Sequence, residues 1–482
     1  MVIIVTIIKK VKENSQLYPI RVALASSDGQ ITYSELWNLV SRFASYIKEN
    51  TNNNSDKQEY VLIKGYQNVA YVVAVLSVLL SGNIVVPFEK NISNQKYNEL
   101  KDILKPGMII SDEYYEKFNL DVLREKIKNI HEQNHEIPKE DAISDLLFTT
   151  GTTGESEGIF HTNRSHYATI ENVLNRINMK EHNKTLIIAP LSHSFALRRL
   201  YANLVYGSTI GIIDNLFPFS NVYKAIDDFD LNSIVMVPTT MSFLLEKTYD
   251  ELNKHKDRLT YVEFTGSPLS LNLIDSIKNC LPNTSIYNMY GCTEAGIILG
   301  SDITKNRYKI SSIGQPNINS QVDILDENYH VINGYGKENS GYLSVKGPIL
   351  LHSYFNKEMN NIHNGYLVTQ DIVYKDQDNY FYFIGRDSDI INVGAYKISP
   401  IEVETILNKF DGIEECIYSA KENASLGSLP ILYVIKNEKY NENDFYAYMN
   451  DNLDSYKMPK EIIFIDKIEK TYNGKINRKK YR

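Results

Sequence analysis

Short runs of β-branched and other apolar residues recur along the first half of the chain, and longer amphipathic stretches separate them. Each run is long enough for one buried strand, and each stretch between runs is long enough for a helix. This alternation predicts a layered α/β fold with mostly parallel sheets, in which ligand-binding loops lie at the carboxyl ends of strands. The runs begin at Tyr60, Ile84, Leu146, Leu186, Ile210, Ile234 and Val262.

The pattern changes near Gly341, from where short strands with turn signals predict a small β-rich subdomain. The last part of the chain is predicted to form a small α+β domain. We place the boundary at Arg386, because Asp387-Ser388-Asp389 separates two apolar strands there. The prediction is a large N-terminal domain, residues 1–386, and a C-terminal domain, residues 387–482.

Length and composition exclude several classes of protein. A chain of 482 residues suits two or three domains, and a net charge of −8 argues against nucleic acid as a partner. Three cysteines cannot form a disulfide framework, so a reducing, cytoplasmic compartment is expected. The apolar runs Val2–Ile8 and Val69–Leu80 are shorter than the roughly 20 residues that cross a bilayer. We expect both to be core segments, and no membrane span.

A loop rich in glycine and threonine, Thr149-Thr-Gly-Thr-Thr-Gly154, follows the apolar run at Leu146. Glycine lets backbone N–H groups approach an anion closely, and threonine hydroxyls add donors, so the loop suits a polyphosphate. It lacks the Lys-Ser or Lys-Thr pair of a P-loop. By itself the loop fits a phosphate site and a flexible turn about equally.

Further segments carry side chains suited to a nucleotide. In Tyr287-Asn-Met-Tyr-Gly-Cys-Thr-Glu-Ala-Gly296, Tyr290 offers a flat face for a base, and Glu294 offers a carboxylate for magnesium. The other segments are Val368-Thr-Gln-Asp371, Gly385-Arg386, Gly394-Ala-Tyr-Lys-Ile-Ser-Pro-Ile-Glu-Val-Glu404 and Lys470-Thr-Tyr-Asn-Gly-Lys475.

In this order, the segments resemble the acyl-adenylate-forming superfamily of acyl- and aryl-CoA synthetases, peptide-synthetase adenylation domains and luciferases. The resemblance spans nearly the whole chain, because Ile31-Thr-Tyr-Ser-Glu-Leu and Tyr456-Lys-Met-Pro also match. It is closest to the acyl and aryl acid ligases. It implies that ATP and Mg²⁺ convert a small carboxylic acid to an acyl-adenylate with release of pyrophosphate. The acyl group would then pass to the thiol of coenzyme A or of the phosphopantetheine of an acyl carrier protein.

The resemblance also implies a role for each matched residue. Lys475 would bridge the substrate carboxylate and ATP, Thr293 would contact the α-phosphate, and Glu294 would ligate Mg²⁺. Asp371 and Arg386 would hold the ribose hydroxyls. The other cofactor-binding positions are Thr149, Thr150, Gly151, Thr152, Thr153 and Gly154 around the phosphates, and Gly266, Ser267, Pro268, Tyr290 and Gly291 around adenine.

A lysine ammonium and a metal ion suit this chemistry, because the enzyme must hold two anions together and stabilise charge at the α-phosphorus. In the family, the C-terminal domain turns about a hinge between the two half-reactions, so the C-terminal domain is expected to be mobile. The hinge position is Ser388, and Gly394 and Lys397 belong to the thiolation segment.

The chain departs from the family pattern at several positions. Glu157 stands where a lysine is usual, and an acid there should repel a triphosphate. Gln370, Asn392 and Ala395 replace other usual residues. The departures cluster around pyrophosphate handling and thiolation, so a non-catalytic nucleotide-binding relative is an alternative.

The acid pocket is expected around Ala189-Pro-Leu-Ser-His193-Ser194. This segment lacks the aspartate that pairs an α-ammonium group in amino-acid-activating relatives. An aryl or aliphatic acid without an α-amino group is therefore favoured, with an amino acid as the alternative. We interpret His193 as a pocket wall. Arg198 and Arg199 are expected to expose their charge to solvent; contact with a second substrate carboxylate is the other interpretation.

A competing pattern is His131-Glu-Gln-Asn-His135, which fits the HExxH signature of zinc peptidases. The stretch is polar and is followed by Pro138, so a surface connection is expected.

Overall fold

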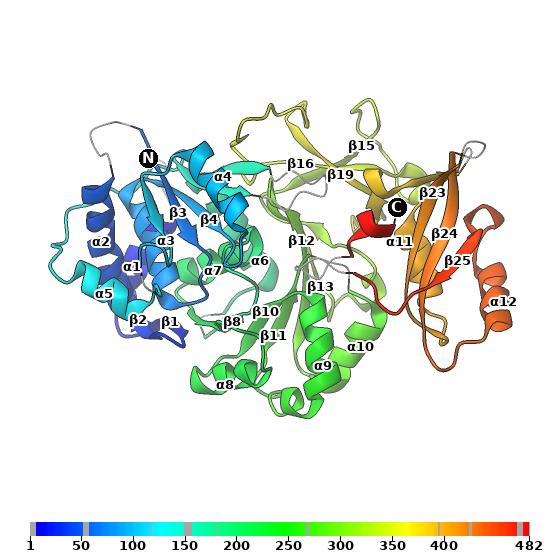
Figure 1. Ribbon diagram of the computed structural model, residues 1–482, viewed down its shortest axis with the longest axis horizontal. Helices are drawn as coiled ribbons and strands as arrows, with labels where there is room; N and C mark the ends of the chain where they lie inside the picture. Colours follow the sequence, from blue (N-terminus) through cyan, green and yellow to red (C-terminus); the bar gives the residue numbers. More distant parts are fainter. Residues whose placement is uncertain are drawn as a thin grey trace. The chain divides into compact units, whose positions relative to one another are not determined.

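The computed structural model describes residues 6–51, 57–115, 117–148, 157–180, 182–266, 269–393, 396–423, 427–469 and 476–481. The chain divides into two compact units (Figure 1). Unit one is Met1–Val322 with Val345–Leu367, and unit two is Asp323–Ser344 with Val368–Arg482. The boundary predicted between residues 386 and 387 stays a prediction.

A nine-stranded sheet forms the centre of unit one. Its strands from β12 to β1 are paired in parallel, and antiparallel strands flank them at both edges, as the alternating pattern predicts. In sheet order the strands are β14 (Gln315–Pro316), β13 (Gly296–Asp302), β12 (Ser285–Cys292), β11 (Tyr261–Phe264), β10 (Ser233–Met236), β8 (Lys184–Ile187), β9 (Thr209–Ile212), β1 (Val22–Ser26) and β2 (Gly29–Thr32).

A second, six-stranded sheet completes the strand framework of unit one. Its four strands from β6 to β5 are parallel, and β7 and β17 add an antiparallel edge. The order is β17 (Ser353–Tyr354), β7 (Gly158–Thr162), β6 (Ile143–Phe148), β4 (Ile84–Phe88), β3 (Tyr60–Lys64) and β5 (Met108–Ile110).

Ten α-helices are described in unit one. At the start of α2, Thr32 and Glu35 form a reciprocal capping box, which explains why the helix begins there. The helices are α1 (Ile7–Leu17), α2 (Tyr33–Asn50), α3 (Val69–Ser81), α4 (Asn94–Leu104), α5 (Leu120–Ile127), α6 (Asn163–Ile177), α7 (Ser194–Tyr206), α8 (Ser220–Asp228), α9 (Pro238–Asn253) and α10 (Leu271–Cys280).

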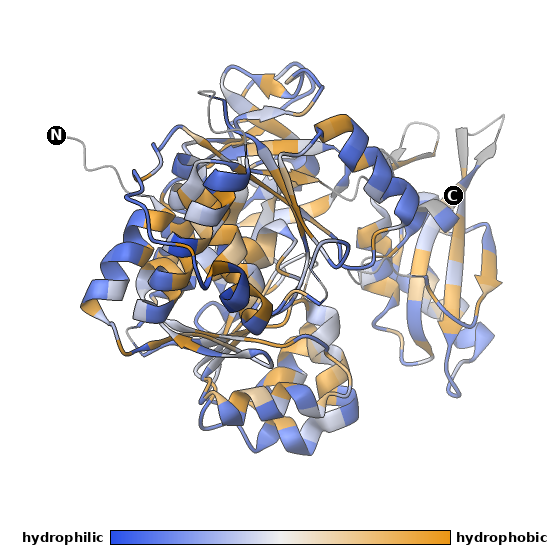
Figure 2. Ribbon diagram, turned by 60° about the vertical axis from the view of Figure 1, so that its left-hand side comes forward, coloured by the Kyte–Doolittle hydropathy of each residue, from blue (hydrophilic) through white to orange (hydrophobic). Residues whose placement is uncertain are grey.

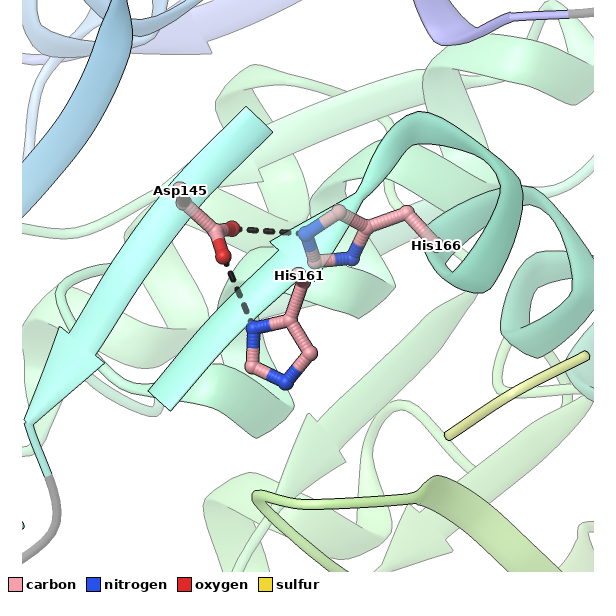
Figure 3. Close-up of side chains that lie close together, drawn as sticks. All are labelled: Asp145, His161 and His166. Atoms are coloured by element: carbon pink, nitrogen blue, oxygen red, sulfur yellow. Dashed lines mark hydrogen bonds and ion pairs between the residues drawn. The ribbon is translucent and has the colours of Figure 1, made fainter. Parts of the chain in front are cut away.

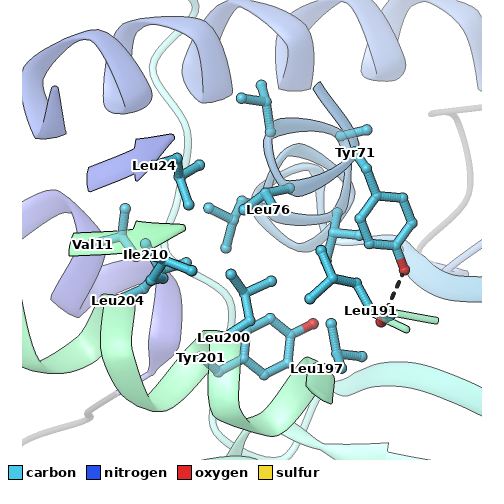
Figure 4. Packing of buried hydrophobic residues seen from close by; sticks show 14 of the residues in the cluster. Val11, Leu24, Tyr71, Leu76, Leu191, Leu197, Leu200, Tyr201, Leu204 and Ile210 are labelled. Carbon is cyan, nitrogen blue, oxygen red and sulfur yellow. Dashed lines mark hydrogen bonds between the residues drawn. The ribbon is translucent and has the colours of Figure 1, made fainter. Parts of the chain in front are cut away.

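The apolar run from Val69 forms α3, and every residue of this helix is buried. Figure 4 shows Leu76 of α3 in the same cluster as Leu24 of β1 and Leu200 of α7. Tyr71 of α3 donates a hydrogen bond to the carbonyl of Leu191 at 3.3 Å. The run is therefore a core helix, as expected. No helix within the described ranges is both long and apolar enough to cross a membrane.

The predicted β-rich part is a five-stranded sheet. Its path is β15 (Gln321–Leu325), β16 (Gly341–Lys346), β19 (Tyr366–Lys375) and β18 (Ile362–His363), and β20 (Phe381–Arg386) also pairs with β19. The polypeptide passes between the two units within this group of strands.

The rest of unit two is α+β, as predicted, with its own core around Phe445 and Tyr418. In Figure 2, hydrophobic residues gather in the strands and inner helices of the protein, whereas the loops are mostly hydrophilic. The elements are β21 (Ile391–Val393), β22 (Tyr396–Ile398), α11 (Pro400–Leu407), β23 (Ile413–Asn423), β24 (Gly427–Lys436), α12 (Glu442–Asn452) and β25 (Glu461–Phe464).

Candidate active site

The tight turn between β12 and β13 carries four of the candidate residues. Tyr290 and Gly291 lie near the end of β12, and the pairing register shifts between them. A Cβ atom on Gly291 would lie 1.8 Å from the carbonyl oxygen of Gly296, so only glycine fits. Thr293 and Glu294 follow in the turn between these two closely packed strands.

Hydrogen bonds hold the backbone of this turn. The carbonyl of Thr293 accepts from Arg198 at 2.8 Å, and the carbonyl of Glu294 accepts from the N–H of Leu351 at 2.6 Å. Both side chains are half-buried, and no described residue forms a hydrogen bond or ion pair with the Glu294 carboxylate. That carboxylate fits a magnesium ligand, since Mg²⁺ prefers carboxylate oxygens.

Neighbouring candidate segments leave the same edge of the nine-stranded sheet. Gly266 follows β11 with a φ of +91°, and the hydroxyl of Thr265 donates to the carbonyl of Met289 at 2.7 Å. The segment with His193 and Ser194 follows β8. Because β8, β10, β11 and β12 are parallel, their carboxyl ends meet at one edge, where α/β proteins bind ligands.

His193 and Ser194 begin α7. Burial lowers the pKa of His193, so its ring is neutral near pH 7, which fits a pocket wall better than a cation. The hydroxyl of Ser194 accepts a hydrogen bond from Arg198 at 2.7 Å.

The candidates in unit two are described separately. Asp371 of β19 lies opposite Arg386 of β20, and Oδ1 of the aspartate is 3.0 Å from Nε of the arginine. Ser388 lies in a short 3-10 helix, Asp387–Asp389. Lys397 lies in β22. The other candidates lie outside the described residues: Thr149, Thr150, Gly151, Thr152, Thr153, Gly154, Ser267, Pro268, Gly394 and Lys475.

The expectation that Arg198 and Arg199 face solvent is wrong. Their exposed fractions are 3% and 0%. Nη2 of Arg199 lies 2.8 Å from the equally buried Glu263 of β11. Sequence spacing on one helix could not reveal this, because apart from Ser194 the partners of the two arginines come from strands and turns more than 30 residues away.

Sequence reasoning also missed a buried cluster of Asp145, His161 and His166 (Figure 3). Asp145 of β6 and His161 of β7 are register partners, and His166 is on α6. Oδ1 of Asp145 is 2.8 Å from Nδ1 of His161, and Oδ2 is 2.6 Å from Nε2 of His166. The available signal was a charged residue directly before the apolar run at Leu146.

Charge in this cluster is set by burial and by the ring contacts. Burial would raise the pKa of Asp145, but His166 and His161 outweigh it and lower the pKa, so the carboxylate is ionised. Burial lowers the pKa of His161 to about 4, against the opposing effect of Asp145. The His161 ring is therefore neutral near pH 7.

The three side chains are close enough to share a metal ion, but the contacts within the cluster argue against one. Each carboxylate oxygen of Asp145 lies at hydrogen-bond distance from a ring nitrogen, 2.8 Å for His161 and 2.6 Å for His166. Such a hydrogen bond needs a proton on the ring nitrogen, and that proton occupies the position where a metal would bind. On its other side, Nε2 of His161 faces both Nη2 of Arg198 at 3.0 Å and the Thr293 carbonyl oxygen at 2.8 Å.

The HExxH stretch is a surface connection, as expected. It is not helical, His131 is exposed, and Nε2 of His135 contacts the backbone carbonyl of Ser41 at 2.9 Å. The two histidines do not lie one helical turn apart, as a zinc peptidase requires.

Glu157, the acid where a lysine is usual, forms an ion pair with Lys357. The lysine offsets the charge that should repel a triphosphate. Sequence reasoning had no means to identify a partner 200 residues away.

Comparison with known proteins gives a match over most of the chain. The model of the AMP-binding enzyme family matches residues 11–355, and that of the AMP-binding enzyme C-terminal domain matches residues 402–475. A 2-succinylbenzoate–CoA ligase of Bacillus subtilis (strain 168) is 27% identical over 481 residues, which cover 97% of this chain and 96% of that protein. The corresponding ligase of Bacillus licheniformis is 25% identical over 484 residues, covering 97% and 98%.

Solved structures of similar proteins also match nearly the whole chain. The o-succinylbenzoate CoA synthetase from Bacillus subtilis, in complex with its acyl-adenylate intermediate, is 25% identical with a TM-score of 0.84, covering 98% of this chain and 97% of that chain. The same synthetase with ATP and a magnesium ion also gives 25% and 0.84, covering 98% of each chain. ATP-bound MatB from Rhodopseudomonas palustris, 17% identical with a TM-score of 0.88 and covering 99% and 98%, shares the fold.

Proposed function

Since the chain belongs to the AMP-binding enzyme family, as the resemblance predicted, and is an AMP-forming acid–thiol ligase, we propose that its acid is 2-succinylbenzoate and its acceptor coenzyme A. The observation that carries the proposal is the full-length match to ligases named for this pair of substrates. ATP-dependent activation proceeds through an acyl-adenylate, the species bound in the Bacillus subtilis synthetase.

The segment before α7 supports an acid without an amino group. Ala189 to Leu197 contains no aspartate or glutamate that could pair an ammonium, and His193 is neutral near pH 7. An amino acid would find no carboxylate within this segment to pair its ammonium, and Glu89, which acts on His193, lies outside the segment. The amino-acid alternative is thereby disfavoured.

The matched residues keep the roles that the resemblance implies. Glu294 would hold Mg²⁺ and Thr293 would contact the α-phosphate, and Asp371 and Arg386 would hold the ribose. Lys475, in the C-terminal domain 387–482, would bridge the substrate carboxylate and ATP. The support is the half-buried Glu294 carboxylate at the carboxyl edge of the sheet, with which no described side chain forms a hydrogen bond or ion pair.

Coenzyme A is favoured over a carrier protein as the acceptor. The phosphopantetheine of an acyl carrier protein presents the same thiol as coenzyme A, so the thiol itself does not discriminate. The relatives, however, are named as CoA ligases. We propose that Ser388 is the hinge that lets the C-terminal domain move between adenylation and thiolation.

The test is pyrophosphate release with MgATP and one acid at a time: 2-succinylbenzoate, benzoate, malonate, a fatty acid or an amino acid. We expect release with 2-succinylbenzoate, and a thioester once coenzyme A is added. Lys475→Ala should lower release by roughly 10² to 10³, as loss of a charge-stabilising group does. Lys480→Ala, in the same basic tail but paired with Glu469, is the matched control and should leave release unchanged.

Release with another acid only would overturn the substrate. Acyl transfer to a holo carrier protein but not to coenzyme A would overturn the acceptor.

A further inference from the structure

Arg198 links two segments to which the proposed function assigns different tasks. Its Nη1 donates to the hydroxyl of Ser194 at 2.7 Å and approaches the carbonyl of Cys292 at 3.3 Å. Its Nη2 donates to the carbonyl of Thr293 at 2.8 Å. One guanidinium therefore joins the acid-pocket segment to the turn that presents Thr293 and Glu294.

The orientation of this guanidinium is fixed from behind. Nη2 of Arg198 and Nε2 of His161 lie 3.0 Å apart, and each lies 2.8 Å from the Thr293 carbonyl oxygen. Nδ1 of His161 is held by Asp145 at 2.8 Å. The carboxylate therefore fixes the ring that packs against both Arg198 and the Thr293 carbonyl.

Charge balance supports the same arrangement. Arg198 is 3% exposed and Asp145 is fully buried, and a neutral imidazole lies between them. Buried charges are stable only when paired and hydrogen-bonded, so the carboxylate offsets the guanidinium through the ring. A lysine could not replace the planar fork, which here reaches acceptors from α7, β7 and the β12–β13 turn.

We propose that Arg198 is a positioning residue for acyl-adenylate formation, seated by Asp145 and His161. It fixes the Thr293 carbonyl, and with it the directions of the Thr293 and Glu294 side chains, while it also fixes Ser194 at the acid pocket. This inference rests on the proposed roles of Thr293 and Glu294 in holding the α-phosphate and Mg²⁺.

The two half-reactions should therefore respond differently. Adenylation needs the acid, the α-phosphate and the metal at fixed positions relative to one another. A displacement of a reacting group by about 1 Å can cost roughly 10²-fold in rate. Thioester formation from an adenylate that is already made needs neither pyrophosphate departure nor the metal. A purely structural role would lower both steps together.

The first experiment compares Arg198→Met and Arg198→Lys with wild type. We expect pyrophosphate release with MgATP and 2-succinylbenzoate to fall tenfold or more, about 1.4 kcal/mol in barrier. Thioester formation from synthetic 2-succinylbenzoyl-adenylate and coenzyme A should stay within about twofold of wild type by the same scale. An equal fall in both steps, or no fall in adenylation, would overturn the proposal.

The two histidines on Asp145 provide a matched pair. His161→Phe removes the contacts with Arg198 and with the Thr293 carbonyl, whereas His166→Phe removes the other contact of the carboxylate. We expect only His161→Phe to lower adenylation, although both lower the melting temperature. His161→Gln should recover part of the rate, because its amide oxygen can accept from Arg198. Equal losses of adenylation rate in the two Phe variants would contradict the proposal. These two variants test the proposal if Arg198→Met does not fold.

A binding measurement separates this inference from the choice of substrate. If wild type releases no pyrophosphate with 2-succinylbenzoate, the proposed acid is wrong. The positioning role of Arg198 is then tested by the binding of MgATP without an acid. The rise in melting temperature with MgATP should need a higher nucleotide concentration in Arg198→Met than in wild type. Identical titration curves would overturn the positioning role.

Discussion

At the scale of single residues, breaking the ion pair between Arg199 and Glu263 should strongly lower the free energy of unfolding. Both side chains are fully buried, and burial raises the pKa of Glu263 while Arg199 opposes the shift. Arg199→Met leaves an uncompensated buried carboxyl group, so we expect a loss of about 3 to 5 kcal/mol in the free energy of unfolding. Urea denaturation measures it.

The matched control is Lys10→Met, which breaks a surface pair with Glu13 at 2.8 Å. Its expected cost is below about 1 kcal/mol. A second change, Glu263→Gln in the Arg199→Met background, should recover part of the loss. A cost for Arg199→Met as small as that for Lys10→Met would contradict the prediction.

The role of a residue could be predicted where a local sequence pattern determines it. It could not be predicted where a partner distant in the sequence determines it. Glu294 and Asp371 were found from the segments around them. The burial of Arg198 was missed because all its hydrogen-bond contacts except Ser194 lie on β7, β12 and the β12–β13 turn, which only the folded sheet brings to α7.

At the scale of elements, β6, β7 and α6 together hold a histidine that resists protonation. Burial lowers the pKa of His161 from 6.5 to about 4, so between these values the unfolded chain binds a proton that the folded chain does not. The free energy of unfolding therefore falls as pH falls through this window, by at most about 1.4 kcal/mol per pH unit for this group. His166, Asp145 and Arg198 are the charged or titratable groups that face it.

Urea denaturation between pH 7 and pH 4.5 tests this. His161→Gln should flatten the pH dependence, whereas His182→Gln, at an exposed histidine, should leave it unchanged. A wild-type slope that persists in His161→Gln would show that other groups cause it.

The elements themselves were the most predictable level. Each of the seven apolar runs became a strand, because a buried parallel strand needs a continuous apolar sequence. The antiparallel strands β7 and β17 were not expected. The pairing of β17 depends on a segment after residue 350 that returns to the six-stranded sheet.

At the scale of the whole molecule, two compact units with separate cores should unfold as separate cooperative structures. The single tryptophan, Trp37 of α2, packs against the core of unit one. Its fluorescence reports on that unit alone, whereas far-UV circular dichroism reports on both. We expect the two urea transitions not to coincide, and MgATP to shift the fluorescence transition. Superimposable transitions would contradict the prediction.

The turn after β12 has a practical consequence for following catalysis by spectroscopy. None of the three cysteines is in a disulfide; Cys280 and Cys416 are buried, and burial raises the pKa of both thiols, that of Cys280 to about 11. Cys292 is half-buried, between Gly291 and Thr293. A thiol-reactive fluorophore at neutral pH should therefore attach first at Cys292, which gives an environment-sensitive label beside the proposed nucleotide site without any engineered residue.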